Sequence, residues 1–244
     1  MNYQLKDMSN EVVLITGATS GIGRSTAFAL ANLGAKLVLN ARSASTLQSV
    51  VEQLGLENTA GVSGDCSDPQ VTTKMANLAI QRFGKIDSVI ANAGVGFFGS
   101  ILDGNDEMIR ETINTNFIGT INLVRSTVPK LLMRGQGDIL IVSSAAGYRG
   151  NSNEAVYAGT KHAQVGFAGS LERELSQKGI RVSLICPAGT KTNFAFGHGR
   201  DPGEKNLDSY LSPDDVAFQI CTILQLPKNV RIQNINSWSM GQDS

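Results

Sequence analysis

The chain has 244 residues, 41% of them hydrophobic and 17% charged, which is enough apolar material to bury the core of one large α/β domain. Its 21 basic residues equal its 21 acidic residues, so no overall field favours nucleic acid or an anionic membrane surface, and we expect a small-molecule partner. The three cysteines are far apart and indicate neither a disulfide framework nor a metal site, and no apolar segment has signal-peptide or membrane-span length, so we expect a soluble, cytoplasmic protein.

Short apolar runs alternate with longer amphipathic stretches along the chain. This alternation predicts βαβ units wound on a seven-stranded parallel sheet, as a single doubly wound α/β domain over residues 1–244. The predicted strands are 12–16, 36–40, 60–64, 86–91, 138–143, 181–186 and 230–235. The predicted helices lie near 22–33, 44–54, 69–83, 106–134, 153–178 and 213–225.

Local signals support several of these boundaries. Asp68 and Ser212 each precede a proline, an arrangement typical of a helix N-terminus. Glycines stand where five of the helices are expected to stop, at positions 34, 55, 84, 135 and 179. The irregular segment 193–211 is rich in Gly, Asp and charge, and a loop of that length is usually a lid, a binding loop or a disordered segment. We expect it to be the substrate loop.

A glycine-rich turn follows the first predicted strand. It reads Thr-Gly-Ala-Thr-Ser-Gly-Ile-Gly over residues 16–23 and leads directly into a predicted helix. Glycines at such a turn let the backbone approach a pyrophosphate, whose charge is met by the N–H groups at the helix N-terminus. An ordinary strand-to-helix loop is the alternative interpretation, and the position in the first βα unit disfavours it. The TGxxxGxG spacing resembles the motif of the classical short-chain dehydrogenase/reductase family, which has a Rossmann-like fold.

The end of the second predicted strand bears on the choice of cofactor. In dinucleotide-binding folds, an acidic residue about 20 positions beyond the glycines binds the ribose hydroxyls, whereas a basic residue accommodates a 2′-phosphate. This strand end offers no carboxylate but offers Arg42, whose planar charged group suits a phosphate. We therefore expect NADP(H) to be preferred over NAD(H). A solvated arginine that opens a helix is the other interpretation.

Three side chains predict a catalytic site. Ser144 follows the fifth predicted strand, and Tyr157 and Lys161 stand four residues apart on one face of a predicted helix. A nearby ammonium and a cationic nicotinamide would lower the pKa of a tyrosine, and a serine hydroxyl can polarise a substrate oxygen. A Tyr/Lys pair at this spacing is also common on exposed helices, so the pair alone does not decide the matter.

The spacing of these residues resembles that of the same family, in which a serine precedes a YxxxK motif by thirteen residues, as Ser144 precedes Tyr157. The resemblance implies that Ser144 and Tyr157 bind the carbonyl oxygen, that Tyr157 supplies the proton as the general acid/base, and that Lys161 also binds the nicotinamide ribose. It further implies that Asn116, in the segment 114–119, bends its helix and holds a water through which Lys161 relays protons.

The resemblance implies three further cofactor-binding segments: 65–66 beside the adenine, 92–94 beside the nicotinamide ribose, and 187–192, which holds the carboxamide. In the last segment Ala188 stands where the family usually has glycine. The residues expected to bind the cofactor are Gly17, Thr19, Ser20, Gly21, Ile22, Gly23, Arg42, Asp65, Cys66, Asn92, Ala93, Gly94, Tyr157, Lys161, Pro187, Gly189, Thr190 and Thr192.

Five aromatic residues leave two interpretations open. Phe97 and Phe98 are as compatible with a pocket wall as with the core. Phe194, Phe196 and Tyr210 fit either a lid over the substrate or anchors that hold the loop on the surface.

The sequence thus predicts an enzyme, a dehydrogenase or reductase acting on a carbonyl or secondary alcohol. A cofactor-binding sensor of the same fold is the first alternative, and the complete set of Asn116, Ser144, Tyr157 and Lys161 disfavours it. An epimerase or dehydratase is the second, and the roughly fifty residues after Thr192 leave little room for its substrate region. Candidate substrates range over 3-oxoacyl thioesters, steroids, sugars and small ketones. The resemblance also implies a homotetramer or homodimer formed through the two longest predicted helices.

Overall fold

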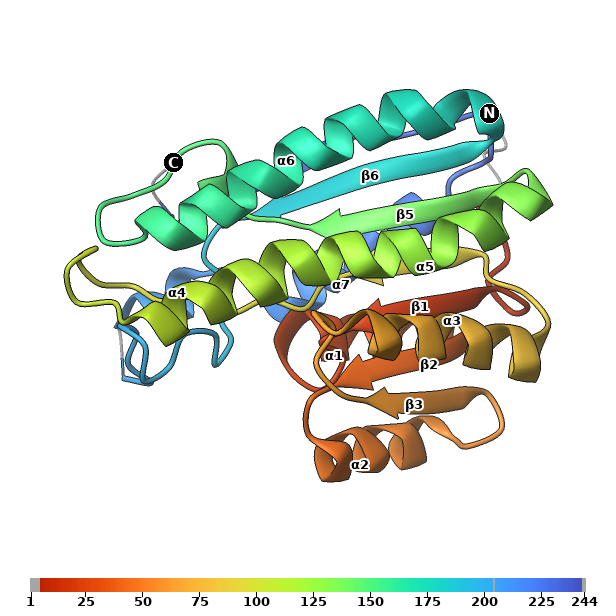
Figure 1. Ribbon diagram of the computed structural model, residues 1–244, viewed down its shortest axis with the longest axis horizontal. Coiled ribbons are helices and arrows are strands. Elements are labelled where there is room, and N and C mark those ends of the chain that lie inside the picture. Colours follow the sequence, from red (N-terminus) through yellow and green to blue (C-terminus); the bar gives the residue numbers. More distant parts are fainter. Residues whose placement is uncertain (1–4, 204, 243–244) are drawn as a thin grey trace.

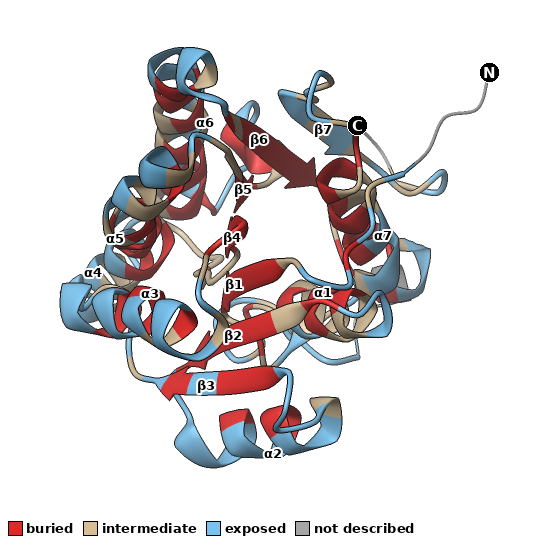
Figure 2. Ribbon diagram, turned by 90° about the vertical axis from the view of Figure 1, so that its right-hand side faces the viewer, coloured by how far each residue is buried: buried red, intermediate tan, exposed pale blue. Residues whose placement is uncertain are grey.

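In the part of the chain that the computed structural model describes, residues 5–203 and 205–242, seven parallel strands form one sheet with the order β3-β2-β1-β4-β5-β6-β7. The strands are β1 (Val12–Thr16), β2 (Lys36–Ala41), β3 (Thr59–Ser63), β4 (Ser88–Ala91), β5 (Gly137–Val142), β6 (Ile180–Pro187) and β7 (Asn234–Ser237). The chain builds outward from β1 to β3 (Figure 1) and then returns to place β4 on the other side of β1 (Figure 2). The predicted doubly wound parallel sheet is confirmed.

Helices cover both faces of the sheet. Their bounds are α1 (Gly21–Asn32), α2 (Ala44–Leu54), α3 (Pro69–Phe83), α4 (Asp106–Ile113), α5 (Gly119–Arg134), α6 (Ala155–Leu175) and α7 (Pro213–Leu224). One buried cluster joins α1, α2 and α7 to one face of the sheet, and a second joins α3, α5 and α6 to the other (Figure 2). Because both faces are covered, the central strands β1, β4, β5 and β6 are buried along nearly their whole length, whereas the edge strands β3 and β7 alternate.

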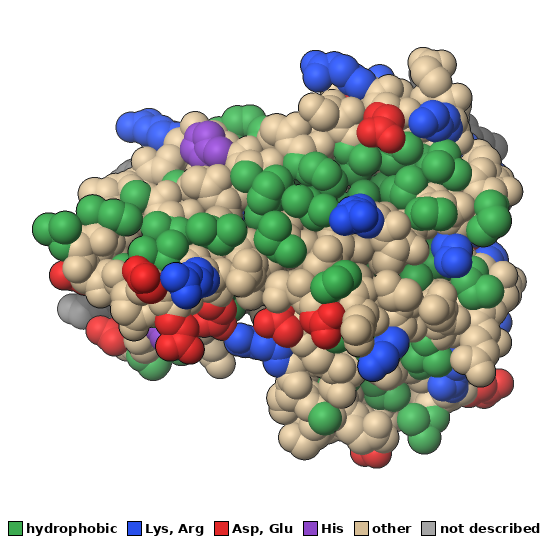
Figure 3. Space-filling view, in the orientation of Figure 1, with side chains coloured by type: hydrophobic (Ala, Val, Ile, Leu, Met, Phe, Trp, Pro, Cys, Tyr) green, Lys and Arg blue, Asp and Glu red, His purple; other side chains and the backbone are tan. Residues whose placement is uncertain are grey.

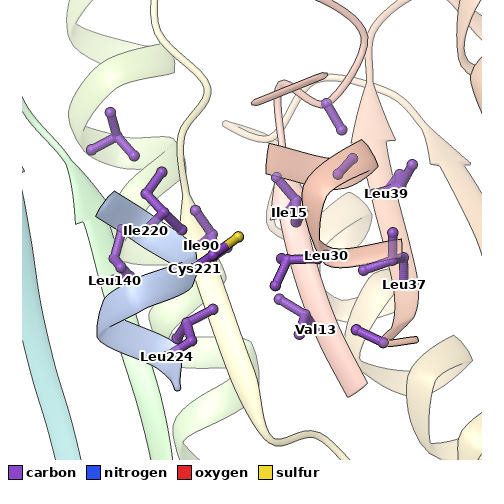
Figure 4. Packing of buried hydrophobic residues seen from close by; sticks show 14 of the residues in the cluster. Val13, Ile15, Leu30, Leu37, Leu39, Ile90, Leu140, Ile220, Cys221 and Leu224 are labelled. Carbon is purple, nitrogen blue, oxygen red and sulfur yellow. The ribbon is translucent and has the colours of Figure 1, made fainter. Parts of the chain in front are cut away.

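The core between the sheet and the α1/α7 pair shows how this burial works. Leu30 of α1 lies beside Val13 of β1, and Ile220 of α7 lies beside Ile90 and Leu140 of the central strands (Figure 4). All five are fully buried. Complete burial of a side chain of this size stabilises a fold by about 1.5–3 kcal/mol, so this layer fixes the positions of the strand ends that carry the site.

The caps confirm the predicted starts of α3 and α7 and the predicted ends of α3 and α5. Asp68 accepts a hydrogen bond from the backbone N–H of Gln70, the second residue of α3, at 2.8 Å, and Ser212 forms a reciprocal capping box with Asp215 at the start of α7. Gly84 and Gly135 end α3 and α5 with φ angles of 79° and 62°. Glycine adopts such angles without the steric cost that a Cβ atom brings.

The last strand is the one whose predicted position is wrong. It was expected at 230–235 but runs over Asn234–Ser237, parallel to β6. The guanidinium of Arg181 explains the delay, because it donates hydrogen bonds to the carbonyl oxygens of the preceding turn, those of Leu226, Pro227 and Val230. Because these carbonyl oxygens accept hydrogen bonds from a side chain and not from a neighbouring strand, the pairing of β7 with β6 starts only after them. The other strand bounds agree with the prediction to within two residues.

The long helix predicted over 106–134 is divided into three parts. A π-helical turn, η1 (Asn114–Ile118), separates α4 from α5. Such turns insert an extra residue into the helical repeat and occur often at functional sites. Here the turn contains Asn116, the residue expected to bend the helix.

Candidate active site

The carboxyl ends of the central strands open into a cavity of about 850 Å³. Its wall includes the glycine-rich turn after β1, Asn92 after β4, Ser144 after β5 and Pro187 at the end of β6. This is the crevice, beside the point where the strand order reverses, at which doubly wound sheets bind ligands. The volume lies within the usual range for small-molecule and cofactor sites.

The glycines of the turn are required by close backbone contacts. Gly17 has a φ of 66°, and a Cβ atom built on it would lie 2.8 Å from the Cα of Ala93. A Cβ on Gly23 would clash with the Gly17 carbonyl oxygen. The Asn92 side chain locks this arrangement by donating hydrogen bonds to the carbonyl oxygens of Thr16 and Gly17, at 3.0 and 3.1 Å. Asn92, expected to touch the cofactor, therefore supports the turn.

The start of α1 is suited to an anion. Thr19, Ser20, Gly21 and Ile22 line the cavity there. Ser20, the N-cap, makes no side-chain capping hydrogen bond, whereas the N-caps of α2, α3 and α4 do. The N–H groups of the first turn of α1 thus have no side-chain acceptor at the N-cap, and they fit a pyrophosphate. Thr192 closes the far side, since a Cβ on Gly21 would lie 3.0 Å from its methyl group.

The alanine in the segment 187–192 fits without strain. Ala188 donates its backbone N–H to the Ser237 carbonyl oxygen at 2.9 Å, and it is not one of the residues with a positive φ. A glycine is therefore not needed here. Pro187, Gly189 and Thr190 line the cavity as expected.

The far end of the cavity contains an ion pair that the sequence analysis missed. Arg42 lies after β2, where it was expected, and its Nη1 is 2.5 Å from Oε1 of Glu111 on α4. Both residues line the cavity, as do Asp65 and Cys66. No signal in the sequence brings residues 42 and 111 together, because they belong to distant units of the fold.

Ser144 and Tyr157 meet at the centre of the cavity. Tyr157 lies in the first turn of α6 and is only 8% exposed. Burial raises the pKa of Tyr157 to about 12, although a hydrogen bond with the Ser144 side chain acts in the opposite direction. The lowering of this pKa that was expected from a nearby ammonium is not found, since burial dominates and the phenol is protonated at neutral pH.

Lys161 is buried one turn further along α6. Its Nζ donates hydrogen bonds to the Val142 carbonyl oxygen and to Gln164 Oε1, each at 3.0 Å, and lies 5.6 Å from the centre of the Tyr157 ring. Burial lowers the pKa of the Lys161 ammonium to about 8. Lys161 also lines the cavity, so its position suits contact with a bound ligand.

Asn116 lies behind the cavity wall and is fully buried. Its side-chain amide donates to the Val95 carbonyl oxygen at 2.9 Å and to Thr160 Oγ1 at 3.0 Å, and its Oδ1 accepts from the Val95 N–H at 2.8 Å. The Asn116 side chain thus joins α6 to the segment after β4. It holds the site together from behind.

Gln164 is a residue of this network that the sequence analysis did not identify. It connects Lys161 to the carbonyl oxygen of Asn116, the residue that the resemblance implies holds a water for Lys161. A signal for it exists, because Tyr157, Lys161 and Gln164 follow the i, i+4, i+7 spacing of one helix face. A polar residue on a buried helix face has to find a partner.

Aromatic side chains form the wall around Tyr157. The ring centre of Tyr157 lies 5.6 Å from those of both Phe98 and Phe194. The backbone N–H of Phe98 donates to the His198 carbonyl oxygen at 2.8 Å, which joins the segment after β4 to the loop 193–211. The pocket-wall interpretation is thus confirmed for Phe98. Phe97, Phe194, Phe196 and Tyr210 also line the cavity.

The described residues contain neither a metal-binding cluster nor a membrane-spanning helix. Residues 5–203 and 205–242 contain no group of three or more His, Cys, Asp and Glu side chains arranged to hold a metal. No helix in the same ranges combines the length and apolar character needed to cross a membrane.

Comparison with known proteins places this geometry in a family. The model of the short chain dehydrogenase family matches residues 11–201. A dehydrogenase/reductase SDR family member 7B from Danio rerio is 33% identical over 92% of this chain and 77% of its own length. For the protein of that name from Bos taurus, the identity is 33% over 80% of this chain, which spans only 63% of that relative. An uncharacterized oxidoreductase from Listeria monocytogenes is 30% identical over 97% of this chain and 98% of its own length.

Solved structures agree with this assignment. An alcohol dehydrogenase from the archaeon Thermococcus sibiricus, complexed with 5-hydroxy-NADP, has a TM-score of 0.87 at 30% identity and covers 96% of this chain and 98% of its own. A 3-ketoacyl-(acyl-carrier-protein) reductase from Brucella melitensis, complexed with NADH, has a TM-score of 0.87 at 27% identity, over 96% and 99% of the two chains. The protein is therefore an oxidoreductase that belongs to the short-chain dehydrogenase/reductase family.

Proposed function

We propose that the protein is an NADP(H)-dependent oxidoreductase that transfers a hydride between the nicotinamide and a carbonyl or secondary-alcohol substrate, with Tyr157 as the general acid/base. The observation that carries the proposal is that Ser144, Tyr157 and Lys161 line the same cavity as the glycine-rich turn. The solved relatives complexed with 5-hydroxy-NADP and with NADH support a nicotinamide cofactor.

The side chains divide the chemistry among them. The bound cofactor supplies or accepts the hydride. Ser144 donates a hydrogen bond to the substrate oxygen and polarises the carbonyl. Tyr157, with a pKa raised to about 12, holds its proton at neutral pH and transfers it to the same oxygen as the carbonyl is reduced. The Lys161 ammonium stabilises the phenolate that remains. In the reverse direction the phenolate takes the proton from the alcohol.

The preference for NADP(H) over NAD(H) rests on Arg42. Its guanidinium lies at the end of β2 on the cavity wall, where a 2′-phosphate would meet it. The side chain is 61% exposed, and its partner Glu111 is 41% exposed. Exposed pairs of this kind contribute only about 0–1 kcal/mol, so a phosphate carrying more charge can displace the carboxylate.

The surface of α5 and α6 supports a homodimer or homotetramer. Hydrophobic side chains gather over these two helices in Figure 3. On α5, Met133 is 77% exposed, and Phe117 of η1 forms an edge-to-face pair with Phe167 of α6, with ring centres 6.1 Å apart. An apolar face of this kind on a single chain favours association. Light scattering is expected to give a mass above that of one chain.

The deciding experiment follows NADPH oxidation against a panel of ketones and 3-oxoacyl thioesters, beside NADH. We expect turnover with at least one ketone class and a lower KM for NADPH. Tyr157→Phe is the control, because it keeps the aromatic contacts with Phe98 and Phe194 but removes the transferable proton. Its kcat should fall by about 10²–10⁴-fold at an unchanged melting temperature. Full activity in Tyr157→Phe would exclude the proposed acid/base role.

A further inference from the structure

The side chain of Gln164 is fully buried between two parts of the site. Its Oε1 accepts a hydrogen bond of 3.0 Å from Lys161 Nζ. Its Nε2 donates to the Asn116 carbonyl oxygen at 2.8 Å and to Thr120 Oγ1 at 2.9 Å. One neutral amide therefore ties Lys161 on α6 to the π-helical turn η1 and the start of α5.

The Asn116 carbonyl oxygen is saturated by side chains. Besides the Gln164 amide, it accepts a hydrogen bond of 2.7 Å from Thr120 Oγ1. A backbone carbonyl oxygen has two lone pairs, and these two donors use both. A water that accepted a proton from Lys161 and passed it on would have no acceptor left at this oxygen.

The amide itself does not replace such a water as a proton carrier. A glutamine side chain offers one acceptor oxygen and two N–H donors and does not ionise near neutral pH. Gln164 can hold the Lys161 ammonium through Oε1 but cannot pass its proton to η1. Lys161 itself is one of the residues that line the cavity.

We propose that Gln164 is a positioning residue for Lys161: its amide fixes Nζ beside the cavity and occupies the Asn116 carbonyl oxygen that a relay water behind Lys161 would need. The inference rests on the proposed function, since it concerns how Lys161 serves Tyr157. It adds Gln164 to the site and identifies Gln164 and Thr120 as the side-chain donors to the Asn116 carbonyl oxygen.

Few titratable groups lie close enough to Lys161 to change its pKa. Tyr157 lies beside it on α6, and the thiol of Cys186 faces it from β6, with a pKa that burial raises to about 11. The group of β5 that contacts Lys161 is the neutral Val142 carbonyl oxygen. The group of α6 that contacts the Asn116 side chain is the neutral Thr160 hydroxyl. A substitution at residue 164 should therefore change the pKa of the Lys161 ammonium measurably.

The test measures the titration of Lys161 in the apoprotein, from the Cε chemical shift of isotope-labelled lysine against pH. Gln164→Leu removes the acceptor, so the midpoint should fall by about one pH unit, the equivalent of one hydrogen bond to a charged group. Gln164→Glu puts a carboxylate beside the ammonium, so the midpoint should rise by about as much. The alkaline limb of the kcat/KM profile should likewise move to lower pH in Gln164→Leu and to higher pH in Gln164→Glu.

Thr127→Val is the matched control, because Thr127 is a fully buried polar residue on α5 whose hydroxyl bonds only within its own helix. It should leave the Lys161 midpoint unchanged. An unchanged midpoint in either folded Gln164 variant overturns the proposal, and if Gln164→Leu fails to fold, Gln164→Glu decides alone. A wild-type protein that reduces no ketone would count against the proposed function only, since the titration needs neither substrate nor cofactor.

Discussion

At the scale of single residues, burial sets the chemistry of the site. Tyr157 and Lys161 are 8% and 3% exposed, and burial moves their pKa values in opposite directions, up to about 12 and down to about 8. Both shifts favour the uncharged form, which is the general response of an ionisable group to removal from water. Burial therefore disfavours the charged pair of phenolate and ammonium in the protein by itself.

Glu111 is the residue expected to limit the affinity for NADP(H). Its carboxylate holds Arg42 at 2.5 Å and adds a negative charge near the expected 2′-phosphate. Glu111→Gln should lower the KM for NADPH by about 5-fold, the equivalent of an exposed ion pair of about 1 kcal/mol. The KM for NADH should change less, because NADH has no phosphate at that position. Steady-state kinetics with both cofactors gives the comparison.

Glu107→Gln provides the control for this prediction. Glu107 is an exposed acid on the same helix and makes no ion pair with Arg42. It should leave the KM ratio of the two cofactors unchanged. A higher KM for NADPH in Glu111→Gln would mean that the carboxylate orients Arg42 rather than competing with the phosphate.

At the scale of elements, the division of the long helix into α4, η1 and α5 brings the site together. The π-helical turn presents Asn116 toward α6 and the segment after β4, and its carbonyl oxygen toward Gln164. By contrast, the ends of the helices depend on local signals. Asp68 and Ser212 cap α3 and α7 through side-chain oxygens within three residues of the N–H groups they accept from.

Ser212→Ala tests the contribution of one of these caps. It removes both hydrogen bonds of the Ser212 hydroxyl in the capping box with Asp215. The free energy of unfolding should fall by about 1 kcal/mol and the melting temperature by about 2–4 °C. Thr73→Ala is the control, because that hydroxyl bonds to a carbonyl oxygen of its own helix and a helix interior tolerates alanine well. An equal loss in both variants would rule out a specific capping effect.

At the scale of the whole molecule, Asp87 joins elements at the amino end of the sheet. Its Oδ2 accepts the Val12 N–H of β1 at 2.8 Å and lies 3.0 Å from Lys85 Nζ, and its Oδ1 lies 2.6 Å from Arg134 Nη1 at the end of α5. Burial by itself would raise the pKa of Asp87, but these donors together hold it below its ordinary value.

The stability contributed by Asp87 should depend on pH. Because the pKa in the folded state is lowered, this stability is present above the unfolded-state pKa, near 3.8, and is lost as the pH falls through the folded-state value. Asp87→Asn should lower the free energy of unfolding at neutral pH by about 2 kcal/mol. The difference between the variant and the wild type should shrink in acid. Urea unfolding at several pH values measures it, and a difference independent of pH would refute the linkage.

The amino-acid sequence by itself determined the doubly wound sheet, the glycine-rich turn and the spacing of Ser144, Tyr157 and Lys161. These features depend on contacts between near neighbours: hydrophobic periodicity, glycines at tight turns, and residues one helical turn apart. The capping boundaries were predictable for the same reason.

Only the tertiary structure decided which distant groups meet. The pair of Arg42 and Glu111, the link from Lys161 through Gln164 to the Asn116 carbonyl oxygen, and the late start of β7 all join residues from separate βα units or packed helices. Their partners are chosen by how the layers pack around the sheet, and a polar group that packing buries takes whichever partner lies within hydrogen-bond distance. No periodicity in a single sequence encodes that choice.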